Sequence, residues 1–293
     1  MQTRQISAAI RGIDVHVHLD DEMTRSRNPP AAARMADYFK TNLDGMEVPE
    51  LAQYYRERNL MAVLVNTTNY TRTGIPPVPN DHIAAAVSQF PDVFLGMGAI
   101  DPWEGEAAVK EVRRCARELG LVGIGELNPG RQAFYPDDRR FFPIWEAAEE
   151  EGLVLMLHSG MAGFGAGTPG GSGLELGYTR PIPHMDSVAA NFPGLRIICA
   201  HPSWPWQDEA LAMALHKSNV YIDLSGYAPK YFPEALVRNM TRRLQDRVLF
   251  GTDFPMLQVD RWLNEFHEIE MDDDVRSKIL LRNAAEIYGL TVQ

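Results

Sequence analysis

The sequence predicts a TIM barrel, the α/β fold in which eight parallel strands alternate with helices, formed as one domain over residues 1–293. Eight short apolar runs recur along the chain, each ending in polar residues, and amphipathic segments lie between most of them. Near-continuous apolar runs are typical of parallel strands covered on both faces. A doubly wound open sheet gives a similar local pattern, and it is the number of strands that favours the closed barrel.

The predicted strands are rich in Val, Ile, Leu and Met, and most end at a polar cluster where a loop is expected. In chain order they are residues 13–18, 60–67, 94–101, 121–128, 153–159, 195–203, 220–226 and 247–253. The first run, IDVHVH, differs from the others because two histidines alternate with its apolar residues.

Four segments between these strands show clear helical spacing. Glycine at a helix end is a usual stop signal, and acidic residues are favoured in the first turn by the helix dipole. The segments with these features are residues 104–120, 137–152, 206–218 and 272–290.

The composition argues against several classes of partner. A formal net charge of −11 disfavours a surface that tracks nucleic-acid phosphates, because such surfaces are rich in Lys and Arg. No window approaches the roughly 18 apolar residues of a membrane span, and residues 1–10 lack the apolar core of a signal peptide. The two cysteines, Cys115 and Cys199, lie too far apart in unlike contexts to suggest a disulfide framework. The expected partner is a small molecule, and the expected compartment is the cytoplasm.

Polar residues gather at the predicted strand ends. In a TIM barrel the C-terminal ends of the strands form the rim that carries catalytic residues. Six potential ligands lie at such positions, namely His16, His18, Glu126, His158, His201 and Asp253. So many imidazole and carboxylate groups on one rim indicate a metal ion or proton chemistry.

His16 and His18 lie two residues apart on the first predicted strand. Side chains at i and i+2 of a strand point to the same face, so both imidazoles are expected to face the barrel interior. Val15 and Val17 are then expected to point outward onto the helices. Two imidazoles about 7 Å apart along a strand can bind one divalent ion between them.

These motifs resemble the amidohydrolase superfamily, with His-x-His on strand one, histidines ending strands five and six, and an aspartate on strand eight. The segments AHPSWPWQDEALA and VLFGTDFP resemble its amidohydrolase-related branch, which includes aminocarboxymuconate-semialdehyde decarboxylase, aromatic-acid decarboxylases and lactone hydrolases. The resemblance runs from His16 to the terminal KILLRNAAEIYGL. It implies a barrel of the metal-dependent hydrolase type and a homodimer.

The resemblance also implies a role for each rim residue. His16, His18 and His158 would be metal ligands, Asp253 would be both a ligand and the catalytic acid/base, and His201 would contact the substrate as a base or electrophile. Imidazole and carboxylate ligands suit Zn²⁺, with Mn²⁺ as a substitute.

Glu126 departs from the decarboxylase-like pattern, because GIGELNP resembles the strand-four glutamate of binuclear TatD-type hydrolases. It is therefore included among the candidate metal ligands. Either it bridges two ions, with His158 and His201 on the second, or it contacts the substrate or a ligand. One ion is expected rather than two.

The main functional prediction is a metal-dependent hydrolase that uses metal-activated water on a lactone, ester or amide, carboxylate-bearing or aromatic. The alternative is a nonoxidative decarboxylase, a carboxy-lyase, in which Asp253 protonates a ring carbon; Glu126 tilts the prediction towards hydrolysis. Two further alternatives are a barrel that binds a ligand without turnover and a TatD-like nuclease. The six rim ligands argue against the first of these, and the acidic charge argues against the second.

Substrate contacts are expected around the long segment 159–183, which carries eight glycines and no regular periodicity and is interpreted as a lid over the site. Arg180 in this segment and Arg72 after strand two are candidates to bind a carboxylate. Trp204 and Tyr70 are candidates to stack on a flat substrate.

Overall fold

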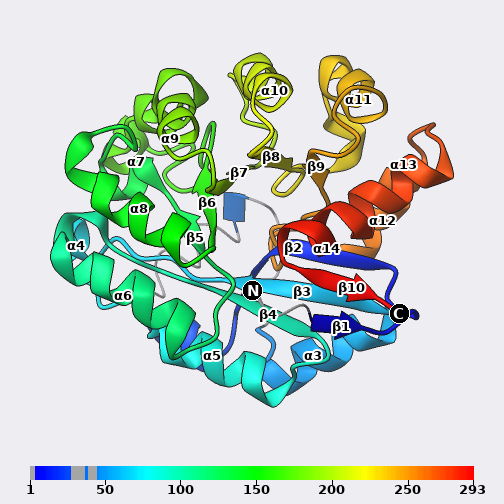
Figure 1. The fold of residues 1–293 in the computed structure, drawn as a ribbon, viewed down its shortest axis with the longest axis horizontal. Coiled ribbons are helices and arrows are strands. Elements are labelled where there is room, and N and C mark those ends of the chain that lie inside the picture. Colours follow the sequence, from blue (N-terminus) through cyan, green and yellow to red (C-terminus); the bar gives the residue numbers. More distant parts are fainter. Residues whose placement is uncertain (1–3, 28–36, 39–44) are drawn as a thin grey trace.

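A computed structural model describes residues 4–27, 37–38 and 45–293 of the chain. At the centre of the molecule lies an eight-stranded parallel sheet in which each strand pairs with the next one along the chain (Figure 1). Each apolar run of the sequence coincides with one strand. The strands are β2 (Gly12–His18), β3 (Leu60–Val65), β4 (Phe94–Gly98), β5 (Gly123–Leu127), β6 (Val154–His158), β7 (Arg196–Ala200), β8 (Val220–Asp223) and β9 (Val248–Leu249).

The sheet closes on itself between its first strand and the segment that follows its last. The backbone N–H of Val15 donates to the carbonyl of Phe250 at 3.0 Å, and that of His18 donates to the carbonyl of Phe254 at 2.8 Å. A parallel bridge between Val17 and Phe254 lies in the same seam. These bonds join the two edges, so the predicted TIM barrel is confirmed.

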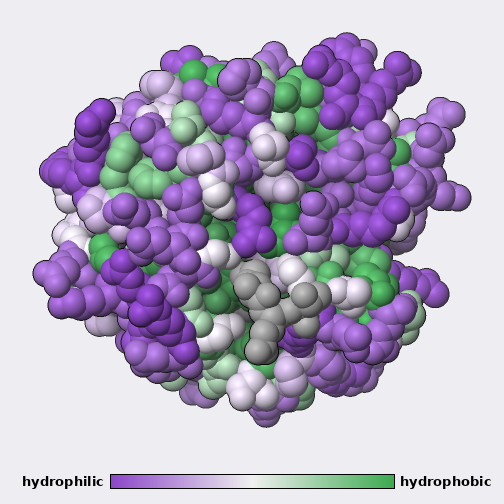
Figure 2. Space-filling model, in the orientation of Figure 1, coloured by the Kyte–Doolittle hydropathy of each residue, from purple (hydrophilic) through white to green (hydrophobic). Residues whose placement is uncertain are grey.

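Helices surround the barrel (Figure 1), and most of the surface seen in Figure 2 is hydrophilic. None of the helices in the described ranges has the length and apolar character needed to cross a membrane. The helices are α1 (Glu22–Arg27), α3 (Val48–Glu57), α4 (Tyr70–Thr73), α5 (Asn80–Gln89), α6 (Glu106–Arg117), α7 (Pro129–Gln132), α8 (Phe142–Glu150), α9 (Asp186–Asn191), α10 (Gln207–His216), α11 (Glu234–Met240), α12 (Val259–His267), α13 (Asp273–Ser277) and α14 (Asn283–Ile287).

The helix predicted over residues 272–290 is divided in two by a π-helical turn, Lys278–Arg282. The two halves bury their apolar side chains in different places. Val275 of α13 belongs to the layer between barrel and helices, whereas Ala284 and Ile287 of α14 belong to the cluster inside the barrel. The wider turn changes the buried face between these two contacts.

Two apolar layers result from strand alternation. In β6, Val154 and Met156 lie in the barrel interior, while Leu155 and Leu157 pack under the surrounding helices. His158 continues the interior series at the strand end, because it follows Met156 by two residues.

Strand β2 departs from this alternation, and the expectation for Val15 was wrong. Val15 lies in the interior cluster, while Val17 lies in the outer layer as expected. The pairing of β2 with β3 shifts register between Asp14 and Val17. Such an irregularity changes the direction of neighbouring side chains, so both Val15 and His16 can be fully buried.

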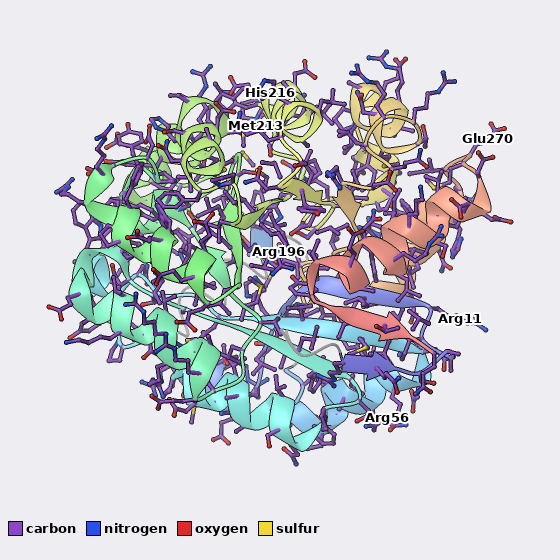
Figure 3. The ribbon with its side chains drawn as sticks, in the orientation of Figure 1. Arg11, Arg56, Arg196, Met213, His216 and Glu270 are labelled. Carbon is purple, nitrogen blue, oxygen red and sulfur yellow. The ribbon has the colours of Figure 1, made fainter. Side chains whose placement is uncertain are left out.

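A second, small sheet lies beside the barrel, where β1 (Arg4–Ile6) pairs in parallel with β10 (Leu290–Val292). Arg196, at the start of β7, lies near the centre of the ring of helices (Figure 3). Its guanidinium donates to the carbonyls of Gly152 and Ile287 and so connects α14 to the end of the barrel where the strands begin.

Asp14 is fully buried and accepts hydrogen bonds from Thr252 Oγ1 at 2.6 Å and Tyr55 Oη at 2.9 Å. Burial raises its pKa to about 6 against the opposing effect of these bonds. Tyr55→Phe is expected to lower the free energy of unfolding by about 1.5–3 kcal/mol, because it removes a hydrogen bond to a buried acidic group. Urea unfolding measures this change. Tyr54→Phe is the matched control, since Tyr54 Oη lies 3.5 Å from Gln258 Oε1 and makes no hydrogen bond to a buried carboxylate among the described residues. An equal loss in both variants would contradict the role of Tyr55.

Candidate metal centre

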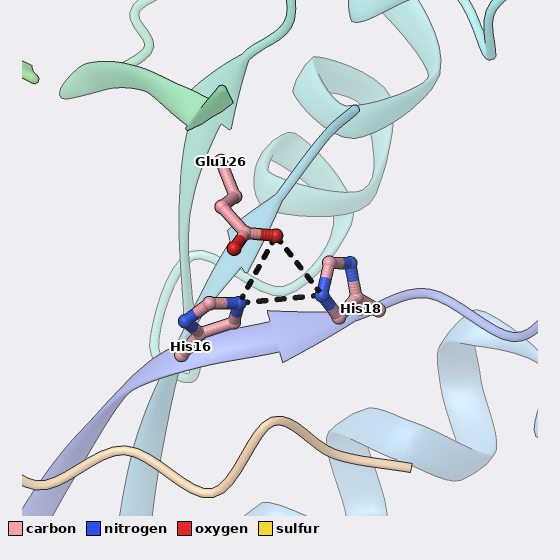
Figure 4. Close-up of side chains that lie close together, drawn as sticks. All are labelled: His16, His18 and Glu126. Carbon is pink, nitrogen blue, oxygen red and sulfur yellow. Dashed lines mark hydrogen bonds and ion pairs between the residues drawn. The ribbon is translucent and has the colours of Figure 1, made fainter. Parts of the chain in front are cut away.

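The two histidines of β2 lie together at the end of the strand. Their Nε2 atoms are 3.3 Å apart. Glu126, at the end of β5, faces both of them, with its Oε2 atom 3.7 Å from His16 Nε2 and 3.9 Å from His18 Nε2 (Figure 4). The predicted convergence of these three side chains is therefore present.

Asp253 reaches the same point from the segment after β9. Its backbone N–H donates to the carbonyl of His16 at 3.0 Å, and its Oδ1 atom lies 3.2 Å from His18 Nε2 and 3.7 Å from His16 Nε2. Asp253 has a φ of 64° and His201 a φ of 68°, in the left-handed region that non-glycine residues rarely adopt. Such backbone strain is typical of functional sites, where the side chain must point in one direction.

The donor set fits a divalent cation. Ligands bound to one cation at about 2.0–2.2 Å lie roughly 3–3.5 Å from one another. The separations among His16 Nε2, His18 Nε2 and Asp253 Oδ1 are 3.2, 3.3 and 3.7 Å, close to this range.

The opposite ring nitrogen of His16 is held by a buried carboxylate. Nδ1 of His16 lies 3.1 Å from Asp223 Oδ2, an arrangement common for metal-binding histidines because the carboxylate fixes the ring orientation. Burial lowers the pKa of His16, but the charge of Asp223 and its hydrogen bond outweigh that effect and raise it well above the ordinary value. Asp223 also accepts from the backbone N–H of His201 at 3.1 Å.

Glu126, His158 and His201 form a second, more compact group. Glu126 Oε1 lies 2.6 Å from His158 Nδ1 and 3.2 Å from His201 Nε2. The first of these is a hydrogen-bond distance, too short for two ligands arranged around one ion. Burial alone would raise the pKa of Glu126, but the facing histidines hold it well below its ordinary value.

His158 carries a buried polar atom without a partner. Its Nε2 atom has no hydrogen bond within the described part of the chain. Buried polar atoms are almost always satisfied, so this nitrogen fits a ligand position. Burial also lowers the pKa of His158, which favours the neutral imidazole that binds metals.

A cavity of about 470 Å³ opens above these side chains, a volume suited to a small molecule. It is lined by His18, His201 and Asp253, and also by Trp204 and residues 161–164 of the glycine-rich segment. The structure therefore places part of that segment beside the candidate site. Gly226 at the rim has a φ of 71°, and a Cβ there would lie 2.7 Å from His201 Nδ1, so close approach requires glycine.

The sequence predicted that Arg72 and Arg180 bind a substrate carboxylate, and the structure does not place either of them at the cavity. Arg72 donates to the backbone carbonyls of Gly130 and Gly173. Arg180 pairs with Glu209, with Nε 2.9 Å from Oε1. Neither arginine lines the cavity, because both guanidinium groups are occupied in holding loops.

The two aromatic residues predicted to stack on a substrate, Trp204 and Tyr70, lie in different places. Trp204 lines the cavity. Tyr70 is 43% exposed and faces a different hollow, beside Asp101 and Glu104. The expectation that Tyr70 stacks on a substrate in this cavity is therefore wrong, because α4 turns it outward.

Sequence reasoning missed Asp223 and Arg131. Asp223 follows Tyr221 by two residues on β8, and Tyr221 faces the interior, so strand period was the available signal. Arg131 lies in α7, directly after β5, and lines the cavity next to Glu126. Arg131 could have been predicted from its position, because it lies just after β5, the strand that carries Glu126.

The amidohydrolase family profile matches residues 13–290, nearly the whole chain. The chain belongs to the amidohydrolase family. Among curated members, it is 39% identical over 238 residues to 2-amino-3-carboxymuconate-6-semialdehyde decarboxylase of Dictyostelium discoideum, covering 72% of this chain and 65% of that protein. It is 24% identical over 249 residues to gamma-resorcylate decarboxylase of a Polaromonas species, covering 72% and 75%.

Solved structures share the barrel fold. An uncharacterised TIM-barrel protein of Bordetella bronchiseptica superposes with a TM-score of 0.76 at 23% identity, covering 94% of this chain and 97% of that one. A dihydroxybenzoic acid decarboxylase of Polaromonas, solved with manganese and the inhibitor 2-nitroresorcinol, has a TM-score of 0.64 at 19% identity, covering 95% and 97%. At these identities the likeness supports the fold alone.

Proposed function

We propose that this amidohydrolase is a nonoxidative decarboxylase, which releases CO₂ from a small aromatic or conjugated acid. The proposal is supported above all by the chain's similarity to curated proteins, since both relatives described above are decarboxylases. They favour the alternative of the sequence prediction over hydrolysis. The cavity above the rim is of a size for such an acid.

One divalent cation is proposed to be held by His16, His18 and Asp253, whose donor atoms lie 3.2–3.7 Å apart. The unpartnered Nε2 of His158 is proposed as a fourth ligand. When bound, it would act as a Lewis acid that stabilises negative charge developing on the substrate. Manganese in the related Polaromonas decarboxylase supports Mn²⁺ as well as Zn²⁺. The hydrogen-bonded arrangement of Glu126 with His158 supports one ion over a bridged pair.

Asp253 is proposed as the proton donor, because it lines the cavity beside the candidate ligands. A hydroxyl next to the substrate carboxylate makes the ring carbon that bears the carboxylate electron-rich. The protonated Asp253 gives its proton to that carbon, forming a C–H bond. The C–C bond to the carboxylate then breaks, its electrons restore the conjugated ring, and CO₂ leaves. Water returns the proton to Asp253.

His201 is proposed to orient the substrate in this step. Its ring is fixed by Ser225, whose Oγ lies 2.8 Å from Nδ1, and by Glu126 on the other side. The charge and hydrogen bond of Glu126 raise the pKa of His201 above its ordinary value, although burial opposes this. A protonated His201, with its two N–H groups held by Ser225 and Glu126, would stabilise an anionic substrate oxygen through its positive charge.

The test is an incubation of metal-loaded enzyme with two panels of compounds. The first contains hydroxybenzoates, including gamma-resorcylate, and 5-carboxyvanillate; the second contains aromatic lactones, esters and amides. We expect release of CO₂ from the first panel, followed by a coupled CO₂ assay and mass spectrometry of the product. Turnover confined to the second panel would contradict decarboxylation and restore the hydrolase reading.

A further inference from the structure

Arg131 occupies a position shared by two cavities. The cavity above the rim and a neighbouring one of about 240 Å³ are both lined by His18, Asp253, Phe164 and Arg131. Asn128 caps the short helix α7, accepting from the backbone N–H of Arg131 at 3.0 Å. This cap fixes the backbone from which the guanidinium reaches the site.

The guanidinium of Arg131 has no anionic partner in hydrogen-bond contact within the described part of the chain. Its Nε atom is buried without a hydrogen bond. The central carbon of the guanidinium, Cζ, lies over the ring of Phe164, 4.9 Å from the ring centroid. Burial lowers its pKa, and the charge of Glu126 only partly opposes this. Arg72 and Arg180, by contrast, are satisfied by protein carbonyls and a carboxylate.

Arg131 is half-buried, and its guanidinium lines the cavity without an anionic partner among the described residues. A bound carboxylate would satisfy it with two parallel hydrogen bonds. We infer that Arg131 binds a second carboxylate of the substrate, one that the reaction leaves in place. This inference rests on the proposed decarboxylase function and names its substrate class as dicarboxylic acids with an electron-rich ring or conjugated chain.

The retained carboxylate is a better partner than the departing one. As CO₂ leaves, its carboxylate loses negative charge, so an ion pair with it would stabilise the ground state more than the transition state and slow the reaction. A carboxylate that keeps its charge is bound equally in both states. Arg131 then contributes to KM and orientation without opposing the chemistry.

The experiment is titration calorimetry of the metal-loaded enzyme with isophthalate, benzoate and the neutral analogue 3-carbamoylbenzoate. These acids lack the activating hydroxyl, so they report binding without turnover. We expect wild type to bind isophthalate about 10- to 100-fold more tightly than benzoate or the amide. Arg131→Met is expected to reduce that preference to within about threefold, with benzoate affinity unchanged.

Arg131→Lys is the conservative variant and is expected to retain part of the preference, because Lys keeps the charge but not the planar fork. Arg180→Met is the control, because Arg180 pairs with Glu209 away from the cavity, and it should keep the wild-type preference. Equal weakening of all three ligands by Arg131→Met, or survival of the preference, would overturn the inference. If wild type releases CO₂ from no acid tested, the proposed function fails while the calorimetry still decides the role of Arg131.

Discussion

Asp253→Asn is expected to lower kcat for CO₂ release by about 10³-fold, because proton transfer by a positioned acid contributes about 10²–10⁴ to rate. Asparagine has the shape of aspartate but cannot deliver a proton. It retains an oxygen that can face His18, so much of the bound metal should remain. Steady-state CO₂ release and metal content per chain measure the two effects separately.

Asp246→Asn is the control for this variant. Asp246 carries a carboxylate in the same part of the chain, but it is exposed and pairs with Lys278 at 2.8 Å. The control should keep wild-type activity. Near wild-type kcat in Asp253→Asn would contradict its role as the acid, and loss of activity that merely follows loss of metal would reduce Asp253 to a ligand.

Removing the cation is expected to abolish CO₂ release, with recovery on addition of Mn²⁺ or Zn²⁺. The reason is electrostatic, because the charge that develops on the substrate would then face Glu126 and Asp253 without a compensating cation. Removal should also lower the free energy of unfolding, by about 2.7 kcal/mol where the ion had been present at 100 times its Kd. Dialysis against a chelator, followed by activity and urea-unfolding measurements, tests both effects.

A pair of histidine variants separates this loss from general damage. His18→Ala removes a ligand at the rim and should give metal-poor, inactive protein. His216→Ala changes an exposed histidine on the outer surface, at the end of α10 (Figure 3), and should retain both metal and activity. Full metal content in His18→Ala would contradict the ligand set.

Local periodicity allowed the strands and the His16–His18 pair to be predicted, because these features depend only on neighbouring residues. The irregular register of β2, which turns Val15 inward, depends on pairing with β3 and left no signature in the alternation. Asp223 and His16, which lie 207 residues apart, meet only because the barrel closes.

The arginines show a second reason why the site could be predicted only in part from the sequence. Arg72, Arg180 and Arg131 all follow strand ends, and the sequence does not say which long side chain is satisfied by a nearby loop. Backbone carbonyls accept from Arg72, and Glu209 accepts from Arg180. Arg131 reaches the cavity because no such acceptor competes for it in the described part of the chain.

An anomalous difference map from crystals grown with Mn²⁺ would show whether the rim side chains hold a cation. We expect one peak per chain, about 2.0–2.3 Å from His16 Nε2, His18 Nε2 and an oxygen of Asp253. A map without a peak at this position, with the three side chains at their present separations, would contradict a cation site at the rim.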